Sequence, residues 1–242
     1  MTATVIIPAR FASTRFPAKI VASDTGRPLV QHVVDAVRRC RLVRQVIVAA
    51  DDMRIVEALR PFDTHCVMTS PHHSSGTDRI AEVARTLDSD IIVNVQGDEP
   101  EIEPEIVDGL IAHLRNSSDD MATAATLFPA GAKVADPNLV KVVMAQDGRA
   151  IYFSRSVIPY DRDSQGARAY YLHLGIYAYR RDFLLKFAAL APTPLETSEK
   201  LEQLRALEHG HSIYVMKVDR AVHGIDTPEQ YEAFVKRWKG IG

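Results

Sequence analysis

Three cationic side chains stand close together in a loop that follows the first apolar stretch of the chain. Arg10, Arg15 and Lys19 have spacings that no single face of a helix would collect. An arginine fork can match phosphate oxygens with two parallel hydrogen bonds, whereas a lysine ammonium acts as a point charge. A loop that leaves a strand also presents backbone N–H groups, so the segment predicts a triphosphate-binding loop. It has neither the Walker A nor the GxGxxG pattern, and a solvated basic loop is the alternative.

Two acidic residues far apart in the sequence supply complementary chemistry. Asp98 follows a largely apolar run that is typical of a strand buried on both faces of a parallel sheet. Such a strand delivers the residues after it to the carboxyl edge, where open α/β sheets bind ligands. Asp226 stands near the end of the chain, and the pair suits Mg²⁺, which combines carboxylates with substrate phosphates and waters. The simpler alternatives are a turn or helix-capping role for Asp98 and a cap of the helix beginning at Thr227-Pro228 for Asp226.

Strand and helix patterns alternate through the first half of the chain, as in βαβ units with a parallel sheet. The pattern predicts strands over 4–7, 45–50, 64–68 and 90–95. It predicts helices over 29–39, 53–60 and 104–116, and between the second and the last a helix with Ile80, Val83, Ala84 and Leu87 on its apolar face and Thr77 or Asp78 as its cap. The sequence therefore predicts an α/β fold.

The alternation of predicted strands and helices stops in the second half of the chain. Strands predicted over 121–127, 140–144, 150–153 and 171–179 have no full helix between them, so antiparallel or mixed pairing is expected. Helices over 181–189 and 198–209, a strand over 213–218 and a terminal helix ending at 238 complete the prediction. We expect a single domain over 1–242 with a mixed sheet, in which residues from roughly 119 to 195 form an inserted smaller lobe.

The composition is that of an ordinary globular protein. The 242 residues are 46% hydrophobic and 25% charged, and the net charge is −2. Because there is no basic tail or lysine run, a nucleic acid polymer is not an expected partner. Cys40 and Cys66 belong to no CxxC or Cys/His cluster and are expected to be reduced thiols. No signal-peptide pattern or bilayer-spanning apolar run is present, so we expect a cytoplasmic protein without membrane contact.

Seven segments, in order over nearly the whole chain, resemble one known family: IPARFASTRFPAK, SSGTDR, VNVQGDEP, YFSRS, HLGIYAYR, LEQLR and GIDTPEQ. Together they are similar to 3-deoxy-D-manno-octulosonate (KDO) cytidylyltransferase, the CMP-KDO synthetase of lipopolysaccharide synthesis. The resemblance implies the nucleotide-diphospho-sugar transferase fold, a Rossmann-like three-layer fold with a mixed sheet, and a smaller lobe that helps to form a homodimer. It also implies that CTP and KDO react with Mg²⁺ to give CMP-KDO and pyrophosphate.

The same resemblance implies roles for particular residues. The implied nucleotide contacts are Pro8, Ala9, Arg10, Ser13, Arg15, Lys19, Ser75, Gly76, Thr77, Arg79 and Gln96. The implied metal ligands are Asp98 and Asp226, which with Arg10 and Lys19 make the expected catalytic set. The implied sugar contacts are Gln96, Arg155, His173, Tyr177, Glu202 and Gln203. Arg155 and His173 are expected on strands as positive or hydrogen-bonding groups for a sugar acid, whereas by itself His173 could be a core histidine and Glu202 a solvated helix residue.

In the implied reaction the anomeric 2-hydroxyl of KDO attacks the α-phosphorus in line while pyrophosphate leaves. The metal and the cations would neutralise the developing charge, so no Ser or Cys nucleophile is needed, and the sequence names no general base.

The chain departs from the family pattern in two places. The family usually has Gly and Pro around the loop lysine, where this chain has Ala18 and Ile20, and often Thr at the position of Ala50. If position 18 requires a positive φ, alanine is costly there. A cytidylyltransferase for an amino-KDO or a sialic acid, and a non-catalytic nucleotide-sugar sensor, are the alternative functions.

Overall fold

The computed structural model of the chain describes residues 1–129, 131–163, 169–220 and 224–240. It divides into two compact units: unit 1 contains Met1–Asp108 and Val222–Gly242, and unit 2 contains Gly109–Ala221. The inserted lobe expected over 119–195 falls within the bounds of unit 2, and its part in dimerisation stays a prediction. Within the described part of the chain, no helix is long and apolar enough to cross a membrane.

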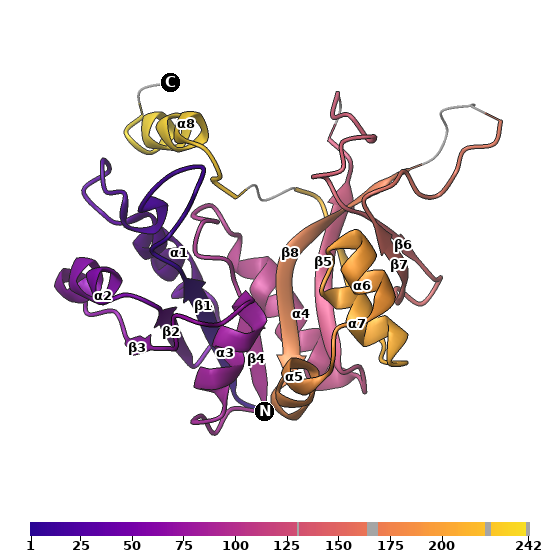
Figure 1. Cartoon of the computed structure of the whole chain (residues 1–242), viewed down its shortest axis with the longest axis horizontal. Helices are drawn as coiled ribbons and strands as arrows, with labels where there is room; N and C mark the ends of the chain where they lie inside the picture. The colour runs from indigo at the N-terminus through magenta and orange to yellow at the C-terminus, as the bar shows by residue number, and fades with distance from the viewer. Residues whose placement is uncertain (130, 164–168, 221–223, 241–242) are drawn as a thin grey trace. The chain divides into compact units, whose positions relative to one another are not determined.

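Unit 1 is built on a parallel sheet with the strand order β3-β2-β1-β4 (Figure 1). Its strands are β1 (Ala3–Ala9), β2 (Gln45–Ala50), β3 (Cys66–Met68) and β4 (Ile91–Asn94). Its helices are α1 (Leu29–Val37), α2 (Met53–Leu59) and α3 (Gly76–Ala84), with the 3-10 turns η1 (Lys19–Val21) and η2 (Arg60–Phe62). Because the strands are parallel, the residues that follow them gather at one edge of the sheet.

The cap of α3 differs from the prediction. Ser75 is the N-cap, and its hydroxyl accepts a hydrogen bond from the Asp78 N–H at 3.0 Å. The Asp78 carboxylate accepts one from the Ser75 N–H at 3.2 Å, which completes a capping box. The expectation of Thr77 or Asp78 as the cap was therefore wrong, and α3 begins at Gly76, within the SSG segment.

The C-terminal helix α8 (Pro228–Trp238) returns to unit 1. Tyr231 and Phe234 are buried in a cluster with Leu29 and Ile225. Thr227 is the N-cap and forms a capping box with Gln230. The alternative interpretation of Asp226 as the helix cap was therefore wrong, because capping does not use its carboxylate.

Unit 2 contains the antiparallel and mixed pairings that the sequence predicted, and α4 (Pro104–Asn116) leads the chain into it. Strand β5 (Met121–Leu127) pairs antiparallel with β8 (Tyr171–Arg180) and parallel with β9 (Ile213–Val218). Strands β6 (Lys141–Met144) and β7 (Ala150–Ser154) form an antiparallel pair, and β6 also pairs with β8. These pairings confirm the α/β class with a mixed sheet.

The helices of unit 2 depart from the sequence prediction at one point. They are α5 (Arg181–Ala189), α6 (Pro194–Glu199) and α7 (Gln203–Glu208). The single helix predicted over 198–209 was wrong, because Lys200 adopts the left-handed conformation, with φ 54°, and ends α6. The break places Glu202 at the start of α7 rather than inside a longer helix.

Both cysteines are free thiols, as the sequence indicated. Burial raises the pKa of Cys40 to about 12 and the pKa of Cys66 to about 11. The thiolate is the reactive form of cysteine, so neither side chain is poised for nucleophilic chemistry near neutral pH.

Ala18 stands in the left-handed region, with φ 55° and ψ 23°, immediately before Lys19. This conformation costs an L-residue with a Cβ roughly 1–2 kcal/mol. Glycine removes that strain but adds freedom to the unfolded chain. We therefore expect Ala18→Gly to raise the free energy of unfolding by about 0.5–1 kcal/mol, measured by urea denaturation. Ala22→Gly, at φ −56°, is the control and should lower it; a less stable Ala18→Gly protein would contradict the strain argument.

Candidate functional site

A cleft at the carboxyl edge of the unit 1 sheet collects side chains that follow β1 and β4 and that precede α3 and α8. Its volume is about 450 Å³, within the usual range for small-molecule sites. The lining residues are Pro8, Arg10, Ala12, Ser13, Thr14, Arg15, Lys19, Ile20, Ser74, Ser75, Gly76, Gln96, Gly97, Asp98 and Asp226. Most of the predicted nucleotide and metal residues are thus found at one site.

Lys19 bridges the two acids of the cleft. Its Nζ donates to Asp98 Oδ2 at 2.6 Å and to Asp226 Oδ1 at 3.3 Å. Arg15 Nη2 donates to the same oxygen of Asp226 at 2.9 Å. The Lys19 side chain is 11% exposed, whereas those of Asp98 and Asp226 are 28% and 44% exposed. The expected meeting of two distant aspartates with the cationic loop is therefore present in the structure.

Backbone contacts place the two aspartates side by side. The Ile225 N–H donates to the Asp98 carbonyl at 2.8 Å, which fixes the residue before Asp226. A side chain at Gly97 would place its Cβ 2.8 Å from Ile20 Cδ1 and 3.1 Å from the Pro8 carbonyl oxygen, so a larger residue there would displace the Ile20 side chain and crowd the Pro8 backbone. In the cationic loop, the centre of the Phe16 ring lies 5.4 Å from that of the Tyr231 ring of α8. The cationic loop and α8 thus hold Lys19 and Asp226 together.

The donor set fits a hard divalent cation only if phosphate oxygens complete its coordination. Asp98 and Asp226 already share one cation, the Lys19 ammonium, and both carboxylates line the cleft. Among the described residues, no group of three or more His, Cys, Asp or Glu could hold a metal by itself. Mg²⁺ in nucleotide-dependent enzymes takes one or two carboxylates plus substrate oxygens. Magnesium binding at this site stays a prediction.

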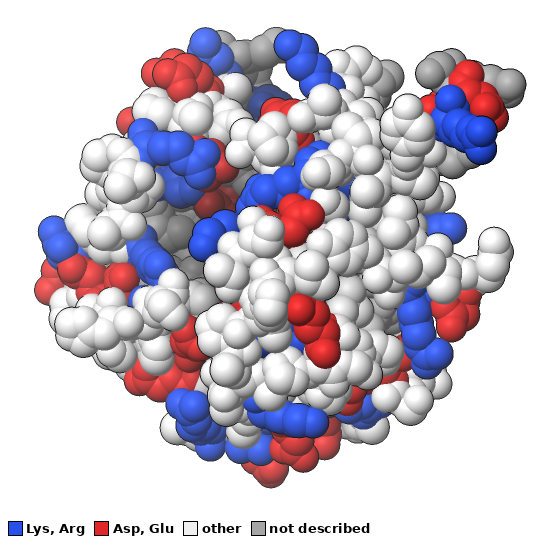
Figure 2. Space-filling model, turned by 45° about the vertical axis from the view of Figure 1, so that its right-hand side comes forward, with Lys and Arg blue, Asp and Glu red and all other residues white. Residues whose placement is uncertain are grey.

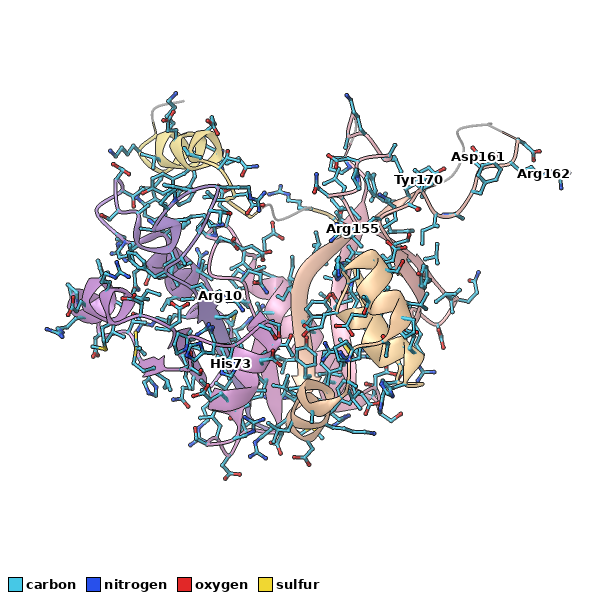
Figure 3. The ribbon with its side chains drawn as sticks, in the orientation of Figure 1. Arg10, His73, Arg155, Asp161, Arg162 and Tyr170 are labelled. Carbon is cyan, nitrogen blue, oxygen red and sulfur yellow. The ribbon has the colours of Figure 1, made fainter. Side chains whose placement is uncertain are left out.

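The cleft lining also joins the cationic loop to the N-terminus of α3. Arg10 Nη2 donates to the His73 carbonyl at 3.0 Å (Figure 3). Ser75 and Gly76 line the cleft where the helix begins, and its first N–H groups and positive dipole end favour anions. Figure 2 shows lysine and arginine interspersed with aspartate and glutamate over the face in view. The cleft is therefore suited to phosphate by the local arrangement of the cationic loop and not by a generally basic surface.

Three of the implied nucleotide contacts do not line this cleft. Ala9 and Arg79 are fully buried, and Thr77 is 3% exposed. Conversely, five lining residues had no predicted contact with a ligand, which are Ala12, Thr14, Ile20, Ser74 and Gly97. All five lie inside or next to the quoted motifs, so the motif boundaries were the signal that could have identified them.

In unit 2, Arg155 lies just after β7 and not on a strand as expected. Its guanidinium donates to the carbonyl oxygens of Glu199 at 2.7 Å, Pro137 at 2.8 Å and Lys200 at 3.3 Å (Figure 3 labels Arg155). In this conformation it secures the turn between α6 and α7. Its contact with a sugar stays a prediction.

His173 lies on β8, as expected. Its Nε2 is 3.1 Å from Thr123 Oγ1, and its ring lies 5.0 Å from that of Phe153 and 5.4 Å from that of Tyr177. Burial lowers the pKa of His173 to about 3 and raises the pKa of Tyr177 well above its usual value. Both side chains are therefore neutral hydrogen-bonding groups near neutral pH, so His173 would not act as a cation for a sugar carboxylate.

Glu202 and Gln203 begin α7. A Glu202 carboxylate oxygen lies 3.8 Å from the Arg205 guanidinium, so this side chain has a nearby cation. Gln203 is 5% exposed, and among the described residues its Nε2 has no hydrogen-bond partner. A buried amide donor of this kind is suited to a hydroxyl ligand. Sugar binding by these two residues stays a prediction.

The lowered pKa of His173 predicts a pH dependence of stability. The unfolded chain binds a proton at this histidine below about pH 6.5, whereas the folded protein excludes it until about pH 3. The free energy of unfolding should therefore fall as the pH decreases below about 6.5, by at most about 1.4 kcal/mol per pH unit from this group. We expect His173→Gln to lose less stability than the wild type between about pH 7 and pH 5 in urea denaturation. The control is His65→Gln, at an exposed histidine, and equal losses in wild type and His173→Gln would contradict the argument.

Comparison with known proteins gives concordant matches. The family model described as cytidylyltransferase matches residues 4–213. A 3-deoxy-manno-octulosonate cytidylyltransferase of Pelobacter propionicus is 49% identical, over 100% of this chain and 99% of that protein. One of Geobacter metallireducens is also 49% identical, over 98% of each chain.

A solved structure described as CMP:2-keto-3-deoxy-manno-octonic acid synthetase complexed with CTP superposes on the chain with a TM-score of 0.94. It shares 38% identity, and the match covers 99% of each chain. This likeness confirms the fold that the sequence motifs implied. The chain therefore belongs to the 3-deoxy-manno-octulosonate cytidylyltransferase family of enzymes.

Proposed function

We propose that this chain transfers CMP from CTP to KDO and releases pyrophosphate. The observation that carries the proposal is the bridging of Asp98 and Asp226 by Lys19, with Arg15 beside them, in a cleft of nucleotide size. Two relatives that are 49% identical over nearly their whole length are named 3-deoxy-manno-octulosonate cytidylyltransferase. A structural relative at 38% identity is described as complexed with CTP.

The cleft residues would bind and orient the triphosphate. Arg10 and Arg15 would pair with phosphate oxygens, and Ser75 and Gly76 would present the N-terminus of α3. Lys19 would place its ammonium where negative charge grows as pyrophosphate leaves. Since the sugar hydroxyl is itself the nucleophile, the chain needs no covalent intermediate.

Asp98 and Asp226 are the residues that would hold Mg²⁺ when the nucleotide is bound. The ion would supply charge neutralisation at the phosphate oxygens. The chain's own contribution is the fixed spacing of the two carboxylates, which the Ile225 to Asp98 backbone hydrogen bond maintains.

Apart from Gln96 in unit 1, the proposed sugar contacts belong to unit 2. His173 and Tyr177, both neutral, would exchange hydrogen bonds with hydroxyl groups, and Gln203 would supply its Nε2 donor, which has no partner within the described part of the chain. Glu202 at the start of α7 would accept from a hydroxyl.

We place the reaction in the cytoplasm, in the supply of activated KDO for lipopolysaccharide, and the active form is a homodimer. Unit 2 supports the dimer with exposed apolar side chains at Leu127, Ile151, Val157 and Tyr160, which are 54%, 62%, 39% and 79% exposed. Size-exclusion chromatography with light scattering tests the dimer, and a monomeric mass at micromolar concentration would contradict it.

A pyrophosphate-release assay tests the activity. We expect turnover only when CTP, KDO and Mg²⁺ are all present. The other ribonucleoside triphosphates, an amino-KDO, a sialic acid and hexose 1-phosphates serve as competing substrates. Faster turnover with a sialic acid or amino-KDO would change the proposed sugar, turnover with a hexose 1-phosphate alone would refute the acidic-sugar assignment, and CTP binding without turnover would identify a sensor.

A further inference from the structure

Asp51, directly after β2, holds the backbone of the cationic loop. Its Oδ1 accepts a hydrogen bond from the Phe11 N–H at 2.9 Å, next to Arg10 of the cleft. The Asp51 side chain is only 13% exposed, and it does not line the cleft among the described residues. The Arg54 guanidinium stacks on the Phe11 ring, 3.6 Å from its centre. Phe11 is therefore fixed through its side chain as well as through its backbone N–H. Asp51 therefore acts on the start of the loop that carries Arg10, Arg15 and Lys19.

Arg79 on α3 holds the start of the other loop. It is fully buried, and its Nη1 donates to Thr69 Oγ1 at 2.6 Å and to the Ser70 carbonyl at 3.3 Å. These residues begin the segment that leads to Ser74, Ser75 and Gly76. Since Arg79 has no exposed surface, a nucleotide in the cleft could not reach it without a rearrangement of the chain.

The two side chains form a pair. Arg79 Nη2 lies 3.6 Å from Asp51 Oδ2. Among the described residues, the Nε and Nη2 groups of Arg79 have no hydrogen-bond acceptor, and burial lowers the pKa of Arg79 while Asp51 opposes this. A buried guanidinium with only part of its N–H groups hydrogen-bonded depends on its counter-ion, because removal of one partner leaves an uncompensated charge. The Asp51 carboxylate is thus shared between a loop N–H and a buried cation.

Further contacts couple the same two loops. Arg10 donates to the His73 carbonyl at 3.0 Å, and Glu82 Oε2 accepts from the Ser70 N–H at 3.1 Å. The same Glu82 oxygen contacts His73 Nε2. The 70–76 segment is therefore held at its start by Arg79 and in its middle by Arg10, so a change at the Asp51–Arg79 pair should reach both walls of the cleft.

We infer that Asp51 and Arg79 are positioning residues that set the two loops of the cleft relative to each other, and that Arg79 acts through Asp51 and the 69–76 segment rather than by touching the nucleotide. This role goes beyond the implied nucleotide contact of Arg79 and includes a residue to which the family motifs gave no role. It rests on the proposed function only for its kinetic measurement.

The kinetic test uses Asp51→Ala, Asp51→Asn and Arg79→Met in the full chain. Asp51→Ala should raise the KM for CTP by about 10- to 100-fold, as expected for misplaced binding groups, with little change in the KM for KDO. Asp51→Asn keeps an oxygen that can accept from the Phe11 N–H, so it should recover part of the loss. Arg79→Met should raise the KM for CTP in the same way. In the double variant Asp51→Asn/Arg79→Met, the loss of apparent CTP affinity, expressed as a free energy, should be smaller than the sum of the losses in the two single variants.

Asp35→Ala is the matched control, because Asp35 forms ion pairs with Arg27 and Arg38 and does not line the cleft among the described residues. It should lower the Tm without changing the KM for CTP. If the Asp51 and Arg79 variants also lower only the Tm, the pair has a purely structural role and the inference is wrong. Additive effects, or a loss at Arg79 alone, would instead indicate a direct nucleotide contact and would also overturn it.

Amide hydrogen exchange separates failure of the inference from failure of the proposed function, because it needs no substrate. In Asp51→Asn and in Arg79→Met, amides of both 10–15 and 70–76 should exchange faster than in the wild type, while Asp35→Ala leaves both segments unchanged. Faster exchange in one segment only would refute the coupling, even if the protein proved inactive with CTP and KDO.

Discussion

Asp98→Asn is expected to lower kcat for pyrophosphate release by about 10²-fold or more while the protein remains folded. Asparagine has the size of aspartate but carries no charge, so among the residues that the structure describes the Lys19 ammonium would retain only Asp226 as its counter-ion, at 3.3 Å. The cleft would also lose half of the carboxylate pair proposed to hold Mg²⁺. Because the Asp98 side chain is 28% exposed, its neutral replacement should have a small effect on stability.

The measurement is steady-state turnover at saturating CTP and KDO, with thermal unfolding of the same samples. Asp63→Asn is the matched control, since Asp63 adopts a left-handed conformation that asparagine tolerates and does not line the cleft among the described residues. It should retain wild-type turnover. Wild-type kinetics for Asp98→Asn would remove Asp98 from the active site.

Lys19→Met should have a comparable effect on turnover and a larger one on stability. The ammonium is 11% exposed and touches both aspartates, so its removal leaves two carboxylates facing each other with Arg15 as the cation still beside Asp226. We expect kcat to fall by about 10²-fold or more and the free energy of unfolding to fall by about 1–3 kcal/mol. Added Mg²⁺ should raise the Tm of Lys19→Met more than that of the wild type, because a divalent ion can replace the missing charge.

Differential scanning calorimetry over a series of Mg²⁺ concentrations measures the second effect without substrate. Lys236→Met, at an exposed lysine of α8, is the control and should show the wild-type response. Equal Tm shifts for the wild type and Lys19→Met would mean that the ammonium and the metal do not share one position. Undiminished turnover of Lys19→Met would instead contradict the proposed role of Lys19 in charge neutralisation.

Local patterns predicted most of the elements closely. Strand β2 (Gln45–Ala50), helix α4 (Pro104–Asn116) and strand β5 (Met121–Leu127) have the predicted bounds. Their apolar periods and flanking turn residues are properties of short segments, so they can be read without knowledge of the fold. The helix predicted over 198–209 failed because the left-handed Lys200 has no local signal, unlike a glycine or asparagine at such a position.

The sequence by itself determined the chemistry of the candidate site. Residues that follow parallel strands share one edge of the sheet, and this rule placed the cationic loop after β1 together with Asp98 after β4. Applied to β2, the same rule would have indicated Asp51.

Only the tertiary structure decided which groups meet and which are buried. The Lys19 bridge between Asp98 and Asp226, the burial of Arg79 and the neutral state of His173 each depend on segments distant in the chain. The physical reason is that hydrogen bonds and ion pairs act over a few ångströms and desolvation depends on the packed surroundings, so neither is contained in the order of residues along a segment.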